Sequence, residues 1–163
     1  MGKSLIVRGI GMADFEQAAR LLDEVFVGEG YTPDGYGHLV TDVAGRFALP
    51  ATWTYVAEAD GLLAGHVVVC HAGSPLVHLA GDHDAEIRLL ATASYARGSG
   101  IGAALVTACI EHARGFGRSR MVLSTQTIMD SAQRLYSRLG FQRVPASDQQ
   151  WNDRRLLAYE LSL

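Results

Sequence analysis

The residues best suited to chemistry lie in a glycine-rich turn that joins an apolar segment to an amphipathic one. The apolar segment begins at Glu86 and predicts a buried strand, and the turn reads Arg97-Gly-Ser-Gly-Ile-Gly102. After Gly100, apolar side chains recur at helical spacing to about Arg114. The first N–H groups of a helix lack partners within it, and the helix dipole adds positive charge there. The turn therefore predicts a binding site for a phosphate group.

The spacing of these glycines excludes two common nucleotide-binding motifs. A dinucleotide fingerprint would need a third glycine in phase, but Ala103 is followed by Ala104 and Leu105. A P-loop would need Gly-Lys-Ser/Thr, which does not occur at this turn. Taken alone, the turn is also compatible with a purely structural connection, because any strand-to-helix turn can use glycines.

A second block, Ala132-Gln-Arg-Leu-Tyr-Ser-Arg-Leu-Gly-Phe141, follows downstream. Together with the Arg-x-x-Gly-x-Gly pattern of residues 97–102, it resembles the GNAT superfamily of N-acetyltransferases. In that family an acetyl-CoA pyrophosphate loop precedes a segment of the form A-x-x-L-Y-x-x-L-G-F. The specific motifs cover residues 86–141 of this chain. The resemblance implies acetyl-CoA as the cofactor.

The resemblance assigns many of the cofactor contacts to the backbone. Residues 90–92 are expected to pair with the pantetheine amides as an added strand would. The implied cofactor-binding residues are Leu90, Ala91, Thr92, Arg97, Gly98, Ser99, Gly100, Ile101, Gly102, Ser131 and Tyr136. Thr92, Ser94 and Met129 depart from the family's usual valine, proline and asparagine. The last departure removes a pantetheine contact, for which Ser131 is a candidate substitute.

Two side chains are candidates for proton transfer. The resemblance makes Tyr136 the acid that protonates the leaving sulfur, and a phenol with a pKa near 10 keeps its proton at neutral pH. The alternative is a tyrosine that only packs. Glu86 lies eleven positions before Arg97, where family members often carry the base, commonly acting through water. Its alternatives are a solvated carboxylate at a strand end, or a water chain with no dedicated base.

Other polar residues carry no recognisable motif. His71, His78, Asp82, His83 and Asp84 lack the spacing of a known metal site, so we expect a solvated loop and no metal. No serine lies in a G-x-S-x-G nucleophile elbow.

Composition limits the class of protein. With 163 residues, 48% of them apolar and 19% charged, the chain suits one globular domain covering residues 1–163. Its net charge of −3 argues against nucleic-acid or membrane partners. Two cysteines in apolar contexts do not indicate a disulfide framework, and the first residues lack a signal-peptide pattern. We therefore expect a cytoplasmic protein, with a homodimer left open.

Periodicity predicts an α/β domain, and the resemblance implies that this domain is GNAT-like. The expected strands are 5–8, 53–59, 62–70, one from Glu86, 121–125, 141–144 and 155–161. The expected helices are 12–26, with Asp14 as a cap, a short one within 38–47, one from about Gly100 to 114, and one that opens with a capping box at Thr127–Asp130. Asp60-Gly61 predicts a hairpin. The resulting sheet is mixed and mostly antiparallel, with a parallel central crossover, and helices flank it.

The resemblance implies an N-acetyltransferase that moves acetyl from acetyl-CoA directly to a primary amine of a small molecule or peptide. The acceptor would enter over residues 27–50, where Glu29, Asp34 and Asp42 are candidate carboxylates to attract an amine. The alternative is a non-catalytic acyl-CoA-binding module that senses or regulates.

Overall fold

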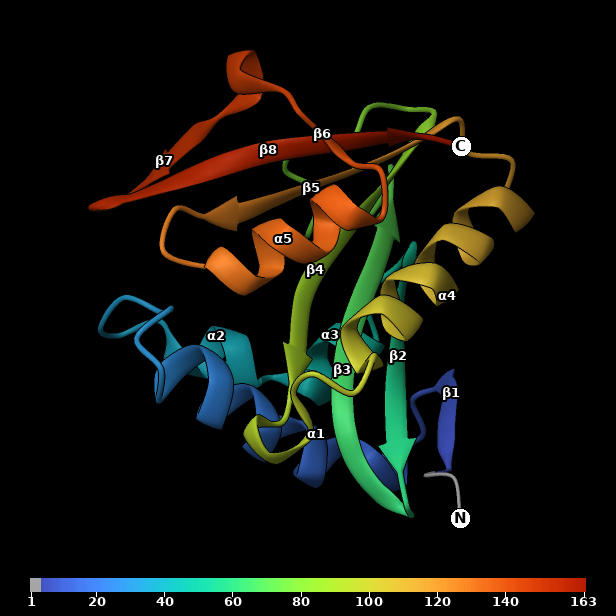
Figure 1. Cartoon of the computed structure of the whole chain (residues 1–163), viewed down its shortest axis with the longest axis vertical. Coiled ribbons are helices and arrows are strands. Elements are labelled where there is room, and N and C mark those ends of the chain that lie inside the picture. The colour runs from blue at the N-terminus through green and yellow to red at the C-terminus, as the bar shows by residue number, and fades with distance from the viewer. Residues whose placement is uncertain (1–3) are drawn as a thin grey trace.

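The computed structural model describes residues 4–163, which form one eight-stranded sheet with helices packed on both of its faces (Figure 1). The strands are β1 (Leu5–Gly9), β2 (Thr52–Ala59), β3 (Leu62–His71), β4 (Asp84–Thr92), β5 (Arg120–Gln126), β6 (Gln142–Arg143), β7 (Gln149–Trp151) and β8 (Arg154–Ser162). The helices are α1 (Phe15–Leu22), α2 (Gly37–Thr41), α3 (Val43–Phe47), α4 (Ile101–Gly115) and α5 (Asp130–Arg138). None of the helices within residues 4–163 is both long and apolar enough to cross a membrane.

The sheet runs in the order β1-β2-β3-β4-β5-β8-β6, with β7 paired to β8. The β4–β5 pair is parallel, and the other pairs are antiparallel. This confirms the predicted mixed sheet with one parallel crossover through α4. The pairing of β4 with β5 stops at Ile87 opposite Leu123. Beyond that point the two strands diverge (Figure 1), and residues 88–92 of β4 have no strand partner on that side.

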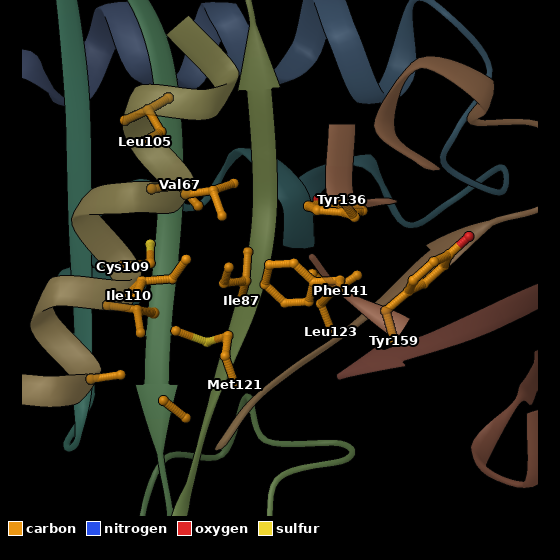
Figure 2. Close-up of a cluster of buried hydrophobic side chains, with 14 of the residues drawn as sticks. Val67, Ile87, Leu105, Cys109, Ile110, Met121, Leu123, Tyr136, Phe141 and Tyr159 are labelled. Atoms are coloured by element: carbon orange, nitrogen blue, oxygen red, sulfur yellow. The ribbon is translucent and has the colours of Figure 1, made fainter. Parts of the chain in front are cut away.

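Each face of the sheet has its own buried cluster. One cluster joins α4 and α5 to β3, β4 and β5 (Figure 2), and the other joins α1, α2 and α3 to residues around Ala91 and Ala93. Helix α4 approaches the sheet closely at Gly65 of β3. A side-chain carbon there would fall 2.6 Å from Ile101 Cγ2 and 2.8 Å from Leu105 Cδ1. Gly65 therefore lets the first turn of α4 sit directly on the sheet.

Local signals predicted several elements correctly and others only in part. Asp60 and Gly61 have φ values of 52° and 81° and turn the β2–β3 hairpin, as expected. The helix expected over 12–26 is instead a 3-10 turn (Met12–Asp14), α1 and a π-helical turn (Asp23–Val27). The short helix expected within 38–47 is two helices, α2 and α3. Strand β7 lies between the expected strands 141–144 and 155–161, where no element was expected.

The predicted capping box at Thr127–Asp130 is wrong. Helix α5 begins at Asp130, its N-cap is Met129, and no side chain caps it. The Thr127 N–H instead donates to the Arg155 carbonyl, at an N···O distance of 3.3 Å. Asp14 does stand at the N-cap of α1, but its carboxylate accepts bonds from Arg8 and from the Gly11 N–H rather than from the helix.

Candidate functional site

The glycine turn presents an open backbone at the start of α4. Gly98 and Gly100 have φ values of 76° and 84°, in the left-handed region that favours glycine. A side-chain carbon at either position would meet nothing within 4 Å. Ile101, only 2% exposed, anchors the helix in the core. Ser99 Oγ donates to the Ala96 carbonyl. The arrangement fits an anion that needs close backbone approach at a helix N-terminus.

Gly102 brings the loop against two neighbouring elements. A side-chain carbon at Gly102 would lie 3.0 Å from Leu135 Cδ2 of α5 and 3.9 Å from Thr92 Oγ1 of β4. The end of β4, the start of α4 and one side of α5 therefore meet at this residue.

Arg97 pairs with a carboxylate from the distant α1–α2 connection. Its Nη1 lies 2.7 Å from Glu29 Oε1, and its Nη2 contacts Glu29 Oε2. This bidentate bond raises the pKa of Arg97. Arg97 therefore links the turn to residues 27–50, and Glu29, a candidate amine-attracting carboxylate, is already held by a cation. Of the other two candidates, Asp42 caps α3 by accepting from the Gly45 N–H, and Asp34 lies exposed.

The part of β4 that has no partner on the β5 side, residues 88–92, contains a bulge in its pairing with β3. Ala91 lies opposite His66 of β3, and Arg88 lies opposite Val68, so Leu89 and Leu90 together face the single residue Val67. Leu89 has a φ of 52°, in the left-handed region, which is unusual for a residue with a branched side chain. Residues 90–92, expected to meet pantetheine, follow this bulge directly.

Tyr136 of α5 is buried, with 4% of its surface exposed, in the cluster that contains Ile87 and Leu123. These are the last paired residues of β4 and β5, and Figure 2 shows Tyr136 near them. Its ring lies 5.7 Å from that of Phe141 and 6.1 Å from that of Tyr159. Burial raises the pKa of the Tyr136 phenol, which therefore stays protonated at neutral pH. Its hydroxyl makes no hydrogen bond to any part of the chain that the structure describes.

Glu86 is fully buried on β4, so the solvated alternative for this carboxylate is wrong. Its Oε2 accepts three backbone N–H bonds, from His78, Leu79 and Ala80, at 2.9, 2.9 and 3.0 Å. Within residues 4–163 its Oε1 has no hydrogen-bond partner. Glu86 thus fastens the β3–β4 connection to the sheet and leaves one oxygen uncommitted.

Ser131 and Met129 lie at the start of α5. Ser131 Oγ accepts a bond from Arg134 Nη2 at 3.2 Å, on the exposed side of the helix. Thr125 Oγ1 donates to the Met129 sulfur at 3.3 Å.

The histidines and aspartates of the β3–β4 connection do not gather at one point. Asp84 accepts from Arg120, the His78 N–H donates to Glu86, and His71 Nε2 lies 3.2 Å from His112 Nε2 of α4. Asp84 and His71 are both buried rather than solvated. Among residues 4–163, no group of three or more His, Cys, Asp or Glu side chains is placed to hold a metal ion.

Sequence reasoning missed the residues that fasten the α1–α2 connection across the site. Gln126 Nε2 donates to the Tyr31 carbonyl, and Arg154 Nη1 donates to the Gly30 carbonyl, both at 2.6 Å. The rings of Tyr36 and Trp151 meet edge to face with centroids 5.7 Å apart. These contacts join positions about a hundred residues apart, and no local pattern in the sequence signals them.

Comparison with known proteins relates the chain to one family. The acetyltransferase (GNAT) family model matches residues 15–141. The chain is 38% identical over 90 residues to a probable N-acetyltransferase, family 8 member 5, from Mus musculus, which aligns over 55% of this chain and 38% of that protein. It is 34% identical over 102 residues to a mycothiol acetyltransferase from a Parafrankia strain, over 56% of this chain and 32% of that protein. The chain thus spans about a third of the length of these relatives.

Solved structures share the fold over nearly the whole chain. A GNAT acetyltransferase from Streptococcus pneumoniae superposes with a TM-score of 0.76 at 20% identity, over 98% of this chain and 99% of that one. A GCN5-related N-acetyltransferase from Kribbella flavida gives 0.75 at 24% identity, over 98% of each chain. The YncA protein of Salmonella typhimurium, whose structure contains its cofactor acetyl-CoA, gives 0.72 at 17% identity, over 98% and 94%.

Proposed function

Because this chain belongs to the GNAT acetyltransferase family, we propose that it transfers acetyl from acetyl-CoA directly to a primary amine of a small molecule or peptide. The observation that carries the proposal is that residues 88–92 of β4 have no partner on the β5 side and end beside the glycine turn of α4. A strand with a free edge and a helix N-terminus with bare glycines suit a ligand that has an amide-containing arm and a diphosphate.

The residues present fit this cofactor. Gly98 and Gly100 leave open space for an anion, and residues 90–92 lie where backbone groups can meet pantetheine amides. Acetyl-CoA supplies an acetyl group activated as a thioester, so the protein must position it and manage protons. Arg97 braces the turn through Glu29, and Ser131 remains the candidate for a side-chain contact at α5.

Tyr136 is the proposed acid. Burial keeps its phenol protonated, and its hydroxyl makes no bond to the described residues that would compete for the proton. Its place beside the last β4–β5 pair puts it where the two strands separate. There Tyr136 Oη would give its proton to the leaving sulfur, while a backbone N–H of residues 90–92 polarises the carbonyl.

Glu86 is the proposed base, acting through water. One of its oxygens is held by three amides, which fixes the carboxylate, and the other is free of protein partners within residues 4–163. A fixed acceptor with one uncommitted oxygen suits removal of a proton from an incoming ammonium.

The acceptor is proposed to enter beside the α1–α2 connection. Glu29 and Asp42 are engaged with Arg97 and Gly45, so of the three candidate carboxylates Asp34 remains to attract a cation. The two cysteines are free and buried, which supports our further proposal of a cytoplasmic protein. We also propose that the chain works as one acetyltransferase domain over residues 1–163. A homodimer is also proposed, and size-exclusion chromatography would measure whether two copies associate.

An amine-library screen tests the proposal directly. Purified protein is given acetyl-CoA and each amine, and free thiol release is followed. We expect release with at least one class of primary amine. Tight acetyl-CoA binding by calorimetry with no release from any amine would instead favour the non-catalytic acyl-CoA-binding module.

The placement of the diphosphate is tested by Gly100→Asp. The new carboxylate repels an anion at the helix N-terminus, so we expect acetyl-CoA to bind at least about tenfold more weakly by calorimetry. Gly117→Asp is the matched control, because Gly117 also has a positive φ of 69° and open space around it but lies just beyond the other end of α4, roughly 20 Å away. Equal affinities of the two variants would contradict the placement.

A further inference from the structure

His66 of β3 is completely buried, and its side chain makes one hydrogen bond. Its Nδ1 lies 2.9 Å from the Leu89 carbonyl oxygen of β4. A carbonyl only accepts hydrogen bonds, so Nδ1 must carry the proton. Burial lowers the pKa of His66 to about 4, so the imidazole is neutral at physiological pH and its Nε2 is bare. Within residues 4–163 Nε2 has no partner.

The acceptor of this bond is the strained residue of the bulge. Leu89 has a φ of 52°, and it begins the pair of residues that face Val67 alone. A bulge takes backbone groups out of the regular ladder and turns the residues that follow it. The imidazole satisfies the Leu89 carbonyl from the neighbouring strand. A left-handed leucine persists only where its surroundings hold it, and this is the side-chain hydrogen bond that the structure gives it.

The bulge lies directly before the backbone assigned to the thioester. Ala91, opposite His66 in the sheet register, is 2% exposed, and Leu90 stands between it and Leu89. A change in the Leu89 torsion angles would therefore rotate the N–H group of Leu90, which has no β5 strand beside it to correct its direction. Groups that stabilise a developing charge must be held in place before the reaction.

We propose that His66 is a positioning residue for acetyl transfer: its Nδ1–H holds the Leu89 bulge and so aims the backbone N–H group of Leu90, which faces away from β3, at the acetyl carbonyl. The inference rests on the proposed function, because it concerns the same site. The proposal gives His66 no contact with the cofactor or the acceptor. It acts through the backbone of β4.

The test compares His66→Leu, which removes the donor, with His66→Asn, whose Nδ2–H₂ occupies the position of Nδ1–H. Val68→Ala is the matched control, because Val68 is equally buried on the same strand and faces Arg88, before the bulge. We measure kcat and the KM for acetyl-CoA with an amine from the screen, together with thermal unfolding. We expect His66→Leu to lower kcat about 10- to 100-fold with KM changed less than about threefold, and His66→Asn to restore most of kcat.

The control separates positioning from loss of packing. Val68→Ala should unfold at a lower temperature while keeping kcat within about twofold of the parent chain. If His66→Leu does not fold, His66→Gln replaces it, because the longer amide places its donor near Nε2 rather than Nδ1. An unchanged kcat in the donor-removing variant, no rescue by His66→Asn, or an equal loss in Val68→Ala would overturn the inference. A parent chain that releases no thiol with any amine would overturn the proposed function itself, a result distinct from these.

Discussion

At the scale of single residues, Tyr136 carries the sharpest prediction. Tyr136→Phe removes one oxygen from a buried ring and leaves its contacts with Phe141 and Tyr159 in place. If the phenol protonates the leaving sulfur, kcat should fall about 100-fold with little change in the KM for acetyl-CoA. Steady-state kinetics measures both values.

Tyr159→Phe is the control for this substitution. Tyr159 belongs to the same cluster, but its hydroxyl points away from the other labelled core side chains (Figure 2). Its removal should leave kcat within about twofold of the parent chain. An equal effect of the two substitutions would mean that Tyr136 has only a packing role.

The proposed base, Glu86, can be altered without losing its hold on the β3–β4 connection. Glu86→Gln keeps an oxygen that can accept from the amides of residues 78–80 but removes the basic carboxylate. We expect kcat/KM to fall about 10- to 100-fold and the acidic limb of its pH profile to change. Asp84→Asn, which alters a neighbouring carboxylate on β4 that pairs with Arg120, should cost stability and leave the profile intact. A preserved profile in Glu86→Gln would make a water chain the base.

At the scale of elements, the Arg97–Glu29 pair joins the α4 turn to the α1–α2 connection. Glu29→Gln removes the carboxylate that neutralises Arg97 and frees this cation for the diphosphate. Acetyl-CoA should therefore bind about two- to fivefold more tightly by calorimetry at low salt, and the gain should shrink at high salt. Glu16→Gln, which breaks an exposed pair with Arg20 on α1, should have no effect. Weaker binding by Glu29→Gln would show that the pair is needed to shape the turn.

The elements also show which features the sequence could predict. The Asp60–Gly61 hairpin and the start of α4 after Gly100 depend on local backbone preferences, so both were predictable. The helix start at Asp130 was not, because the Thr127 N–H bonds to Arg155 on another strand. A distant contact thus overrode a local capping pattern.

The candidate site divides in the same way. Spacing reveals the glycine turn, and the resemblance of residues 132–141 to a family segment singles out Tyr136; both lie around the point where β4 and β5 part. The burial of Glu86 depends on the path of residues 78–80, and the hydrogen bond from Gln126 to the Tyr31 carbonyl joins residues 95 positions apart. The partner of Leu89 is likewise on another strand. Such contacts are set by the tertiary fold, so periodicity and spacing in one sequence do not reveal them.

At the scale of the whole molecule, buried histidines should make stability depend on pH. Burial lowers the pKa of His66 and of His71 to about 4, against about 6.5 in an unfolded chain. Between these values the unfolded state binds more protons than the folded one, so the free energy of unfolding should fall as pH falls from 6.5 toward 4. From pH 7.5 to 5 we expect each of these two histidines to contribute a loss on the order of 2 kcal/mol.

Urea unfolding followed by circular dichroism at the two pH values measures this loss. The aspartates with lowered pKa values, such as Asp14 and Asp84, lose their contribution only below pH 3.8, so this window isolates the histidines. His66→Asn cannot titrate there and should show a smaller loss than the parent chain. An identical pH dependence in both would assign the effect to other groups.

Within residues 4–163, strand pairing between the first half of the sheet (β1–β4) and the second (β5–β8) consists of four residue pairs, from Asp84–Arg120 to Ile87–Leu123. Beyond Ile87 and Leu123 the two halves are joined by side-chain packing, as where Gly102 of α4 meets Leu135 of α5, rather than by strand hydrogen bonds. A ligand bound between the diverging ends of β4 and β5 would contact both halves of the sheet and hold them together. Substrate binding in such a protein should therefore also rigidify the fold, because the bound ligand supplies contacts between the two halves of the sheet that the strands do not make.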